Sequence, residues 1–373
     1  MTGVVLAAAC IAPMGTAPMG TAHADPGNAV GGPLLGRDTT VVQRAPGVPG
    51  LPRVSAESYV VSDLDTGKVL AAKDAHGHHL PASTLKMLTA VALIPKLDPD
   101  KKVKPSWKAC NIEGTAVGIK DSMSYKVSDL FYGMLMVSGN DAATALAEAG
   151  GGVKKTLRLM NAEAQRLRAY DTVAKTVSGL DGKGQRSSAY DLSLIAREGL
   201  KNEAFRDYVS RRTMRFPAPR TKADKKAKRK SGGYQIQNHN RLFTTHDYDG
   251  AYGVKNGWTS KANGSFVGVA ERDGHSVMVA LMNSEAPFWD DTEQLLSWGF
   301  KARGKVTPVG ELVPPRPRAQ PRTAVGGGKQ AKVTPPQAVN RGDESSFPVL
   351  PVGLGVLGAA GLGAFLYVRR APR

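Results

Sequence analysis

Three short motifs in a fixed order constrain this chain more than any other feature: Ser83–Lys86 (Ser-Thr-Leu-Lys), Ser138–Asn140 (Ser-Gly-Asn) and Lys255–Gly257 (Lys-Asn-Gly). The first motif opens an apolar run, Met87 to Leu97, which predicts a helix that begins near the serine. Residues three apart share one face of a helix, so the lysine amine is expected beside the serine hydroxyl. An amine in that place can take the hydroxyl proton. The first motif therefore predicts an activated serine nucleophile.

The sequence around the other two motifs places one on a loop and one on a strand. Val127–Met136 has apolar residues at helical spacing with Ser128 as the expected cap, and another helix begins at Asp141. The second motif should therefore lie between two helices. The third motif falls in the first of three β-branched runs, which are broken at Asn263-Gly264 and at Asp273-Gly274. These runs predict consecutive antiparallel strands.

The order of the expected elements favours an α+β fold. Two apolar runs, Tyr59–Leu64 and Val69–Ala72, flank a turn at Gly67 and predict a β-hairpin that opens the domain. Helices occupy the middle of the chain, three strands follow, and Asp291–Phe300 predicts a closing helix. We expect an antiparallel sheet with helices on both faces.

Four further stretches extend the pattern beyond the motifs: Tyr59–Lys73, Ser178–Leu192, Asn238–Leu242 and Leu295–Phe300. With these stretches, residues 54–301 resemble the serine D-alanyl-D-alanine carboxypeptidases, low-molecular-mass penicillin-binding proteins that trim peptidoglycan stem peptides. One tripeptide alone is a weak signal, whereas three motifs in this order at these separations are specific. The resemblance implies the penicillin-binding-protein/β-lactamase-like transpeptidase fold. It also implies inhibition by penicillins.

The resemblance carries over roles for eight residues: catalytic roles for Ser83, Lys86, Ser138 and Asn140, and substrate-binding roles for Lys255, Asn256, Gly257 and Trp258. Ser83 would attack the carbonyl between two D-alanines with Lys86 as its base, the last D-alanine would leave, and water would hydrolyse the acyl-enzyme. The backbone N–H groups of Ser83 and Trp258 would hold the oxyanion. Lys255 would supply positive potential near the substrate carboxylate. No cofactor is implied.

Two departures from the family pattern concern the substrate carboxylate. Asn256 stands where relatives carry threonine or serine, so an amide replaces a hydroxyl. Many relatives also place an arginine after the last core strand, whereas residues 283–290 contain none. Arg272 is the substitute that the sequence offers.

Three alternative functions stay open. A β-lactamase of the same fold needs a glutamate base between the second and third motifs, but Ser178–Asp191 offers only Asp181 and Asp191 as carboxylates. A cell-wall-binding protein with a weakened site is suggested by Asn256 and the missing arginine, against which the complete first two motifs argue. A transpeptidase would use the same acyl-enzyme with an amine acceptor.

The ends of the chain predict export and membrane anchoring. Residues 1–24 end in Thr-Ala-His-Ala and are typical of a secretory signal peptide whose start is truncated. Residues 347–368 are apolar and long enough to span a bilayer, and the arginines in residues 369–373 predict a cytoplasmic tail and an extracellular catalytic domain. Residues 25–52 and 304–346 are predicted linkers, which leaves 53–303 for the catalytic domain. Only Cys110 would remain after removal of the signal, so no disulfide is expected.

Charge and histidine content complete the expectations. The chain has 50 Lys and Arg against 32 Asp and Glu, a net charge of +18, with the densest basic run over residues 211–230. That run predicts a solvated loop, with anionic wall polymers or lipid headgroups as alternative partners. It lacks the stacking aromatics that nucleic-acid binding would need. His76, His78 and His79 lack a carboxylate or cysteine at ligand spacing, which predicts a solvated turn and no metal site.

Overall fold

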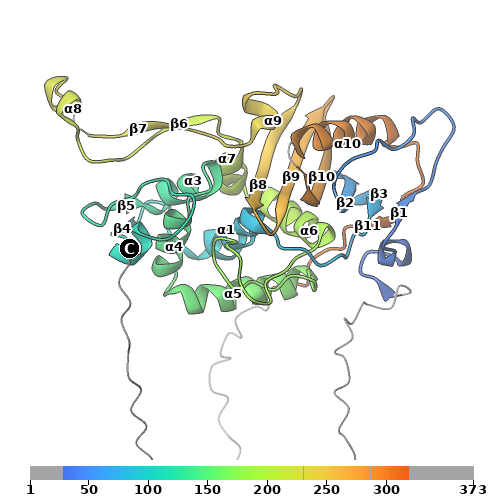
Figure 1. Cartoon of the computed structure of the whole chain (residues 1–373), viewed down its shortest axis with the longest axis horizontal. Coiled ribbons are helices and arrows are strands. Elements are labelled where there is room, and N and C mark those ends of the chain that lie inside the picture. The colour runs from blue at the N-terminus through green and yellow to red at the C-terminus, as the bar shows by residue number, and fades with distance from the viewer. Residues whose placement is uncertain (1–27, 230, 286–287, 319–373) are drawn as a thin grey trace, which may run out of the picture. The chain divides into compact units, whose positions relative to one another are not determined.

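An antiparallel sheet of seven strands forms the centre of the computed structural model, which describes residues 28–318 except 230 and 286–287 (Figure 1). The strand order is β1-β3-β2-β10-β9-β8, and β11 pairs with β3 beside β1. The predicted sheet is confirmed. Its strands are β1 (Thr40–Val42), β2 (Ser58–Asp63), β3 (Lys68–Lys73), β8 (Ala251–Thr259), β9 (Asn263–Arg272), β10 (His275–Ser284) and β11 (Gly310–Glu311).

Helices cover both faces of this sheet, as the sequence predicted. On one face α10 packs against β2, β9 and β10, and on the other face α6 packs against the same strands with α1 and α5 behind it. The α-helices are α1 (Lys86–Leu93), α2 (Trp107–Cys110), α3 (Val127–Met136), α4 (Asn140–Ala149), α5 (Val153–Leu167), α6 (Ala189–Leu200), α7 (Glu203–Ser210), α8 (Lys222–Lys226), α9 (Arg241–Thr244) and α10 (Phe288–Ala302). Short 3₁₀ turns are η2 (Pro33–Gly36), η3 (Ala82–Leu85) and η4 (Ile94–Lys96).

The central strands are buried on both faces because their apolar side chains alternate between two cores. Every residue of β2 is buried. The alternation of β-strand side chains sends one set toward α6 and the other toward α10. The helical core receives Val60, Val267, Met278 and Ala280, and the α10 core receives Tyr59, Val61, Val279 and Leu281. This explains why the strands read as nearly continuous apolar runs.

Two local expectations are confirmed and two are wrong in detail. Gly67 has φ +79° in the β2–β3 turn, and Asp273 and Gly274 have φ +52° and +72° in the β9–β10 turn. Ser128 does not cap α3: it lies inside the first turn, and the Asp129 carboxylate accepts from the Lys126 N–H at 3.1 Å instead. Asn263-Gly264 does not break the strands, because the turn is formed by residues 260–262 and β9 begins at Asn263.

Parts of both expected linkers belong to the packed structure. Strand β1 pairs with β3 in the register Val41↔Ala72, and β11 pairs with the same strand in the register Gly310↔Val69. Leu35 is fully buried, and the Trp298 indole donates to the Pro49 carbonyl at 2.9 Å. The sequence placed residues 25–52 and 304–346 in linkers because these segments are polar and rich in proline. The packing instead extends beyond 53–303 on both sides.

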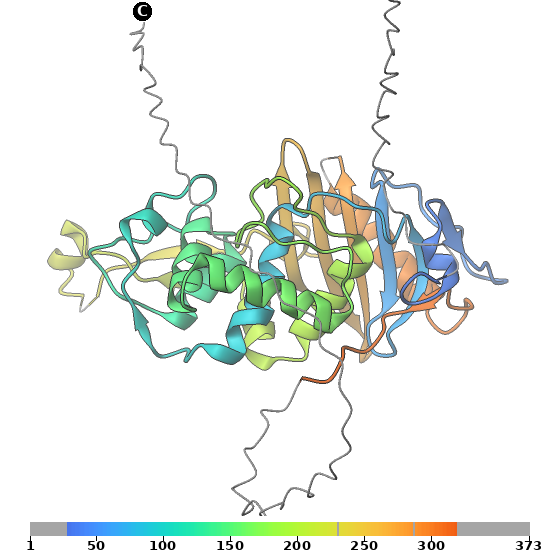
Figure 2. The ribbon, with the colours of Figure 1, turned by 90° about the horizontal axis from the view of Figure 1, so that it is seen from below.

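The basic run forms most of an arm at one end of the molecule. Strands β6 (Thr213–Phe216) and β7 (Tyr234–Gln237) pair with each other and carry α8 between them, away from the sheet (Figures 1 and 2). Another short pair, β4 (Lys102–Val103) and β5 (Tyr125–Lys126), lies in the helical region. In this arm, Asp224 forms ion pairs with Arg215 and Arg229.

The predicted signal peptide, membrane span and tail fall at 1–24, 347–368 and 369–373, outside the described residues. Within residues 28–318, with the gaps already given, no helix has both the length and the apolar character that a bilayer crossing demands.

Candidate active site

The serine of the first motif lies on η3, where the chain enters α1. Ala82 has φ +46°, a left-handed conformation that is unusual for alanine and that turns the chain into η3. The Pro81 carbonyl accepts from the hydroxyls of Thr84 and Ser265, each at 2.6 Å. The turn before the nucleophile is therefore fixed to its own helix and to β9.

The Lys86 amine is fully buried and meets three oxygens. Its Nζ lies 2.7 Å from Ser83 Oγ, 2.8 Å from Asn140 Oδ1 and 2.6 Å from the Ser178 carbonyl. Two of these oxygens are carbonyls, which only accept. A neutral amine satisfies both with its two N–H groups, and its lone pair then faces the Ser83 hydroxyl. We call Ser83, Lys86, Asn140 and Ser178 the nucleophile cluster.

Burial and a second lysine favour this neutral form. Desolvation, and after it the positive charge of Lys255, lower the pKa of Lys86 well below its ordinary value. Burial alone lowers the pKa of Lys255 to about 7. Both lysines are at most 1% exposed. The site thus holds two amines whose proton affinity is reduced, one of them in contact with the nucleophile.

The second motif joins α3 to α4 in the predicted loop. Ser138 adopts a left-handed backbone, φ +66°, and Asn140 is the first residue of α4. The Asn140 amide donates to the Glu113 carbonyl at 2.8 Å, which turns its oxygen toward Lys86. Within the described part of the chain, the Ser138 hydroxyl makes no hydrogen bond and lies 6% exposed. The structure thus places Asn140, and not the Ser138 hydroxyl, on the lysine.

The third motif lies on β8, which ends the sheet beside η3. A Cβ added at Gly257 would lie 2.6 Å from the Ser83 backbone nitrogen, so only glycine allows the strand to approach the nucleophile this closely. The Lys255 amine donates to the Asn256 backbone and side-chain oxygens at 2.8 and 3.2 Å. Trp258 follows at the rim and is 60% exposed. All three motifs therefore meet at one place, as the sequence predicted.

Two contributions to the site were not predicted. The Ser178 carbonyl holds Lys86, and the Asp141 carboxylate accepts the N–H groups of Val117, Gly118 and Ile119 at 2.7 to 3.1 Å. Asp141 is fully buried and so fixes the loop behind the second motif. A backbone carbonyl carries no residue-type signal, whereas the acidic residue at the start of α4 was a signal that could have been used.

Arg272 is wrong as the substitute for the missing arginine. It lies at the far end of β9, opposite His275, while Asn256 pairs with Phe266 near the other end. Its guanidinium contacts Asp249 and stacks on Tyr248. Aromatic stacking and the ion pair hold it there.

Another cation, Arg241, lines the same cavity as Asn256. The two residues line one cavity of about 750 Å³, together with His239, Tyr234, Val137 and Trp289. Burial and then the charges of Lys255 and Arg241 lower the pKa of His239, which lines this cavity. Arg241 is exposed and, among the described residues, its guanidinium has no hydrogen bond or ion pair.

The expectation of a solvated histidine turn is wrong for His76. Its side chain is 17% exposed, and its ring nitrogens lie 2.7 Å from Asp171 Oδ2 and 3.0 Å from the Val30 carbonyl. Asp171 is 95 residues away along the chain. Local spacing therefore could not reveal this pair.

Comparison with known proteins agrees with the geometry. The Peptidase S11 family model, D-alanyl-D-alanine carboxypeptidase, matches residues 43–286. The chain is 37% identical to D-alanyl-D-alanine carboxypeptidase DacB2 of Mycobacterium tuberculosis over 73% of its length and 90% of that protein.

Two solved structures extend the likeness to three dimensions. The D-alanyl-D-alanine carboxypeptidase of M. tuberculosis H37Rv superposes with a TM-score of 0.66 at 36% identity, covering 73% of this chain and all of that one. The Streptomyces K15 DD-transpeptidase gives 0.60 at 25% identity, covering 68% of this chain and 99% of that one.

Proposed function

The chain belongs to the Peptidase S11 family and is a serine-type D-alanyl-D-alanine carboxypeptidase, and from this we propose that its acyl-enzyme forms on Ser83. The observation that carries the proposal is the Lys86 amine, buried and 2.7 Å from the Ser83 hydroxyl. Asn140 and the Ser178 carbonyl occupy its N–H groups. Its lone pair is thereby left for the serine proton.

The proposed reaction runs through an acyl-enzyme on a D-alanine carbonyl. Ser83 Oγ attacks the carbonyl while Lys86 takes its proton, and the N–H groups of Ser83 and Trp258 hold the oxyanion. The protonated lysine, or Ser138 of the second motif, returns a proton to the leaving D-alanine. Water then hydrolyses the ester. Gly257 supports this arrangement, because it brings the β8 backbone against the Ser83 nitrogen.

We assign recognition of the terminal carboxylate to Lys255, with the Asn256 amide and Arg241 nearby. The substrate carboxylate brings a negative charge to Lys255, whose pKa is about 7 without substrate. That charge raises the pKa and favours the protonated amine. Arg241 supplies a permanent charge on the Asn256 side of the same cavity. The Asn256 amide would thus take the place of the hydroxyl that relatives use, and Arg241 would take the place of their arginine from another position in the sequence.

Slow hydrolysis of a penicilloyl-enzyme is expected, so penicillins should act as inhibitors. In Ser178–Asp191, the Asp181 carboxylate is exposed and accepts from Thr259 at 3.0 Å, while Asp191 is buried away in another cluster. Neither is placed as the dedicated base that a β-lactamase needs. The likeness to a DD-transpeptidase keeps an amine acceptor as the second candidate.

The proposed setting is the outer face of the cell membrane. The sequence of residues 1–24 and 347–368 supports export and a single C-terminal span, with residues 319–346 as a tether. The partner would be the peptidoglycan stem peptide. The basic arm around α8 would add attraction to anionic wall polymers.

Labelling with a fluorescent penicillin tests the proposal. We expect full-length protein to give a stable adduct that peptide mass places on Ser83, and to release D-alanine from a peptide ending in D-Ala-D-Ala. Ser83→Ala should lose both activities, while Ser297→Ala, a serine on α10 that contacts Tyr248, should keep both.

Three results would change the proposal. An adduct on another residue would remove the assignment of Ser83. Rapid turnover of nitrocefin would favour the β-lactamase. Preferential transfer of the acyl group to added glycylglycine would favour the transpeptidase.

A further inference from the structure

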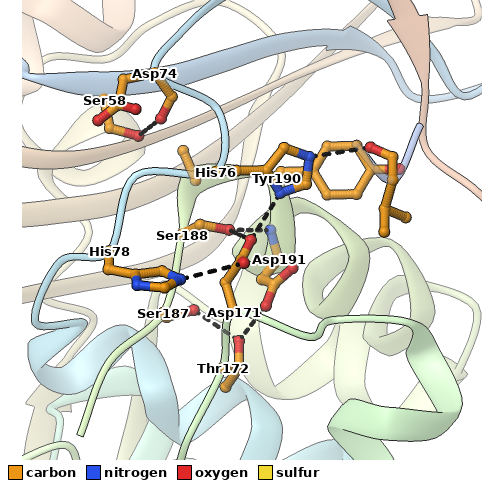
Figure 3. Close-up of polar contacts among 12 residues, drawn as sticks. Ser58, Asp74, His76, His78, Asp171, Thr172, Ser187, Ser188, Tyr190 and Asp191 are labelled. Carbon is orange, nitrogen blue, oxygen red and sulfur yellow. Dashed lines mark hydrogen bonds and ion pairs between the residues drawn. The ribbon is translucent and has the colours of Figure 1, made fainter. Parts of the chain in front are cut away.

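A second buried cluster lies beside the turn that leads to the nucleophile. His76 follows β3, Asp171 lies in the loop after α5, and Asp191 lies in the first turn of α6 (Figure 3). One ligand-type atom from each lies within 4.8 Å of the other two. We call these three residues the histidine cluster.

The imidazole of His76 is oriented from both sides. Its Nε2 faces the Val30 carbonyl at 3.0 Å, and its Nδ1 faces Asp171 Oδ2 at 2.7 Å. The hydrogen bond to a carbonyl fixes the Nε2–H and aims Nδ1 at the two carboxylates. Metal-binding histidines in proteins are held by the same kind of contact.

The carboxylate of Asp191 is incompletely satisfied. Its Oδ2 accepts from Thr172 Oγ1 at 2.7 Å. Its Oδ1 is buried and, among the described residues, has no partner with full hydrogen-bond geometry, although the Asp171 backbone N–H is near enough to lower the pKa of the carboxyl group. The residue is 1% exposed. A buried carboxylate oxygen without a donor is costly. Either a proton on this carboxyl group or a bound cation would relieve that cost.

We propose that His76, Asp171 and Asp191 bind one divalent transition-metal ion, and that Zn²⁺ is the ion this donor set suits. One imidazole nitrogen and two carboxylate oxygens are ligands that Zn²⁺ accepts. The ion would displace the Nδ1 proton of His76, and the two carboxylates would balance its charge. A water or His78, whose Nε2 lies 3.3 Å from Asp171 Oδ1, would complete the coordination.

The separations fit with a small adjustment. Zinc ligands at about 2.0 Å in tetrahedral geometry lie roughly 3.3 Å from one another. His76 Nδ1 and Asp171 Oδ2 are 2.7 Å apart, and all three ligand atoms lie within 4.8 Å of one another, so shifts of about 1 to 2 Å would bring them to that spacing. Ser188 Oγ donates to Asp171 Oδ2 at 2.8 Å, and Thr172 holds Asp191. The outer contacts of both carboxylates are therefore already in place.

An ion here would join two segments that position the nucleophile cluster. His79 and Ser187 exchange backbone hydrogen bonds, and a Cβ on Gly179 would lie 1.8 Å from the Ala82 carbonyl oxygen. Residues 74–82 thus pack along residues 178–187. The ion would act as a structural fastener for the turn before Ser83, with no part in the acyl transfer.

Zinc titration of the full chain tests the site. Protein stripped with chelator and dialysed into chelator-free buffer at pH 7.5 should bind one Zn²⁺ per chain by calorimetry and gain thermal stability. Asp191→Asn and His76→Gln should each weaken zinc binding by at least about 100-fold, because loss of a ligand costs more than loss of a residue that orients one. His246→Gln is the matched control, because that histidine also contacts a carboxylate, Glu293 at 2.7 Å, but at the surface.

Anomalous diffraction from zinc-soaked crystals gives an independent readout. A peak among the three residues would support the proposal even if one variant failed to fold. No bound zinc, a peak elsewhere, or unchanged binding in both variants would overturn it. Penicillin labelling of the same preparations reports on Ser83 separately, so failure of this site is distinguishable from failure of the proposed enzyme mechanism.

Discussion

The nucleophile cluster and the histidine cluster share two stretches of chain, residues 76–86 and 171–191, and Asn140 belongs to the first cluster alone. The two clusters are completed differently. Around Lys86, three oxygens lie within hydrogen-bond distance of the amine and use both its N–H groups and its lone pair. Around Asp191, one buried oxygen is left open. A saturated cluster fixes where a proton can move, whereas an unsaturated one leaves room for a cation. Burial alone therefore does not indicate the use of a titratable group; the count of its partners does.

Replacing the base should give the largest effect. Lys86→Met keeps the volume of the side chain but removes the proton acceptor, so the rate of penicillin acylation should fall by about 10² to 10⁴-fold. Stopped-flow acylation measures this rate. The melting temperature should change little, because removal of a buried amine offsets the loss of its hydrogen bonds to Asn140 and Ser178. A rate within tenfold of the native one would show that another group accepts the proton.

Removing the second lysine should reduce activity less. Lys255→Met eliminates the charge assigned to the substrate carboxylate, and a hydrogen bond between charged groups contributes about 1.5 to 3 kcal/mol. We expect kcat/KM for a D-Ala-D-Ala peptide to fall by roughly 10 to 100-fold, mainly through KM. An equal loss with a substrate amidated at its C-terminus would contradict the assignment.

The same variant should gain stability in a pH-dependent way. Burial lowers the pKa of Lys255 to about 7, below the value of about 10.4 in an unfolded chain. Above about pH 10.4 the amine is neutral in both states and Lys255 costs no folding free energy. As the pH falls toward 7 the unfolded chain takes up a proton that the native protein does not, and the native protein loses stability. Lys255→Met should be more stable by up to a few kcal/mol at pH 7 and equal at pH 10.5. Urea unfolding at both pH values measures this, and a gain that grows with pH would contradict it.

The histidine cluster should tolerate an amide in place of the Asp191 carboxyl group when zinc is absent. Burial, followed by the charge of Asp171, raises the pKa of Asp191 well above its ordinary value, so Asp191→Asn resembles the protonated acid. In chelator we expect the free energy of unfolding to change by no more than about 1 kcal/mol. With zinc, only the native chain should be stabilised. A large loss in chelator would show that the carboxylate charge is needed without a metal.

The smallest effect should come from the exposed cation. Arg241→Gln removes a charge from the cavity that Asn256 lines, and exposed charges contribute about 0 to 1 kcal/mol. KM should rise less than about tenfold, with kcat unchanged. Arg272→Gln at the far end of β9 is the control and should leave KM as it is. Similar effects of the two variants would remove the role of Arg241.

The sequence predicted what residue types and periodicity encode. The nearly continuous apolar runs predicted the central strands of the sheet, and the three motifs predicted the residues that gather around Ser83. Two kinds of contribution escaped. The Ser178 carbonyl acts through its backbone, and the pair His76–Asp171 joins positions 95 residues apart that no local spacing connects.

The edge of the sheet escaped for a further reason. Strands β1 and β11 have three and two residues, too few to show alternation, and they lie in segments rich in proline. They pair with β3 because that strand offers unpaired backbone groups. Only the tertiary structure shows that β3 has backbone groups left to pair.

The pairing of β2 with β10 has a consequence for how the protein folds. Val61 lies opposite Val279, so the centre of the sheet joins residues more than two hundred positions apart. Chains dominated by such distant pairings fold slowly, because a long loop must close before its contacts form. During synthesis β2 cannot pair with β10 until the ribosome has made the chain as far as about Ser284. The enzyme should therefore assemble its catalytic centre late, after nearly the whole domain has been made, and a chain that stops before β10 should have no stable sheet.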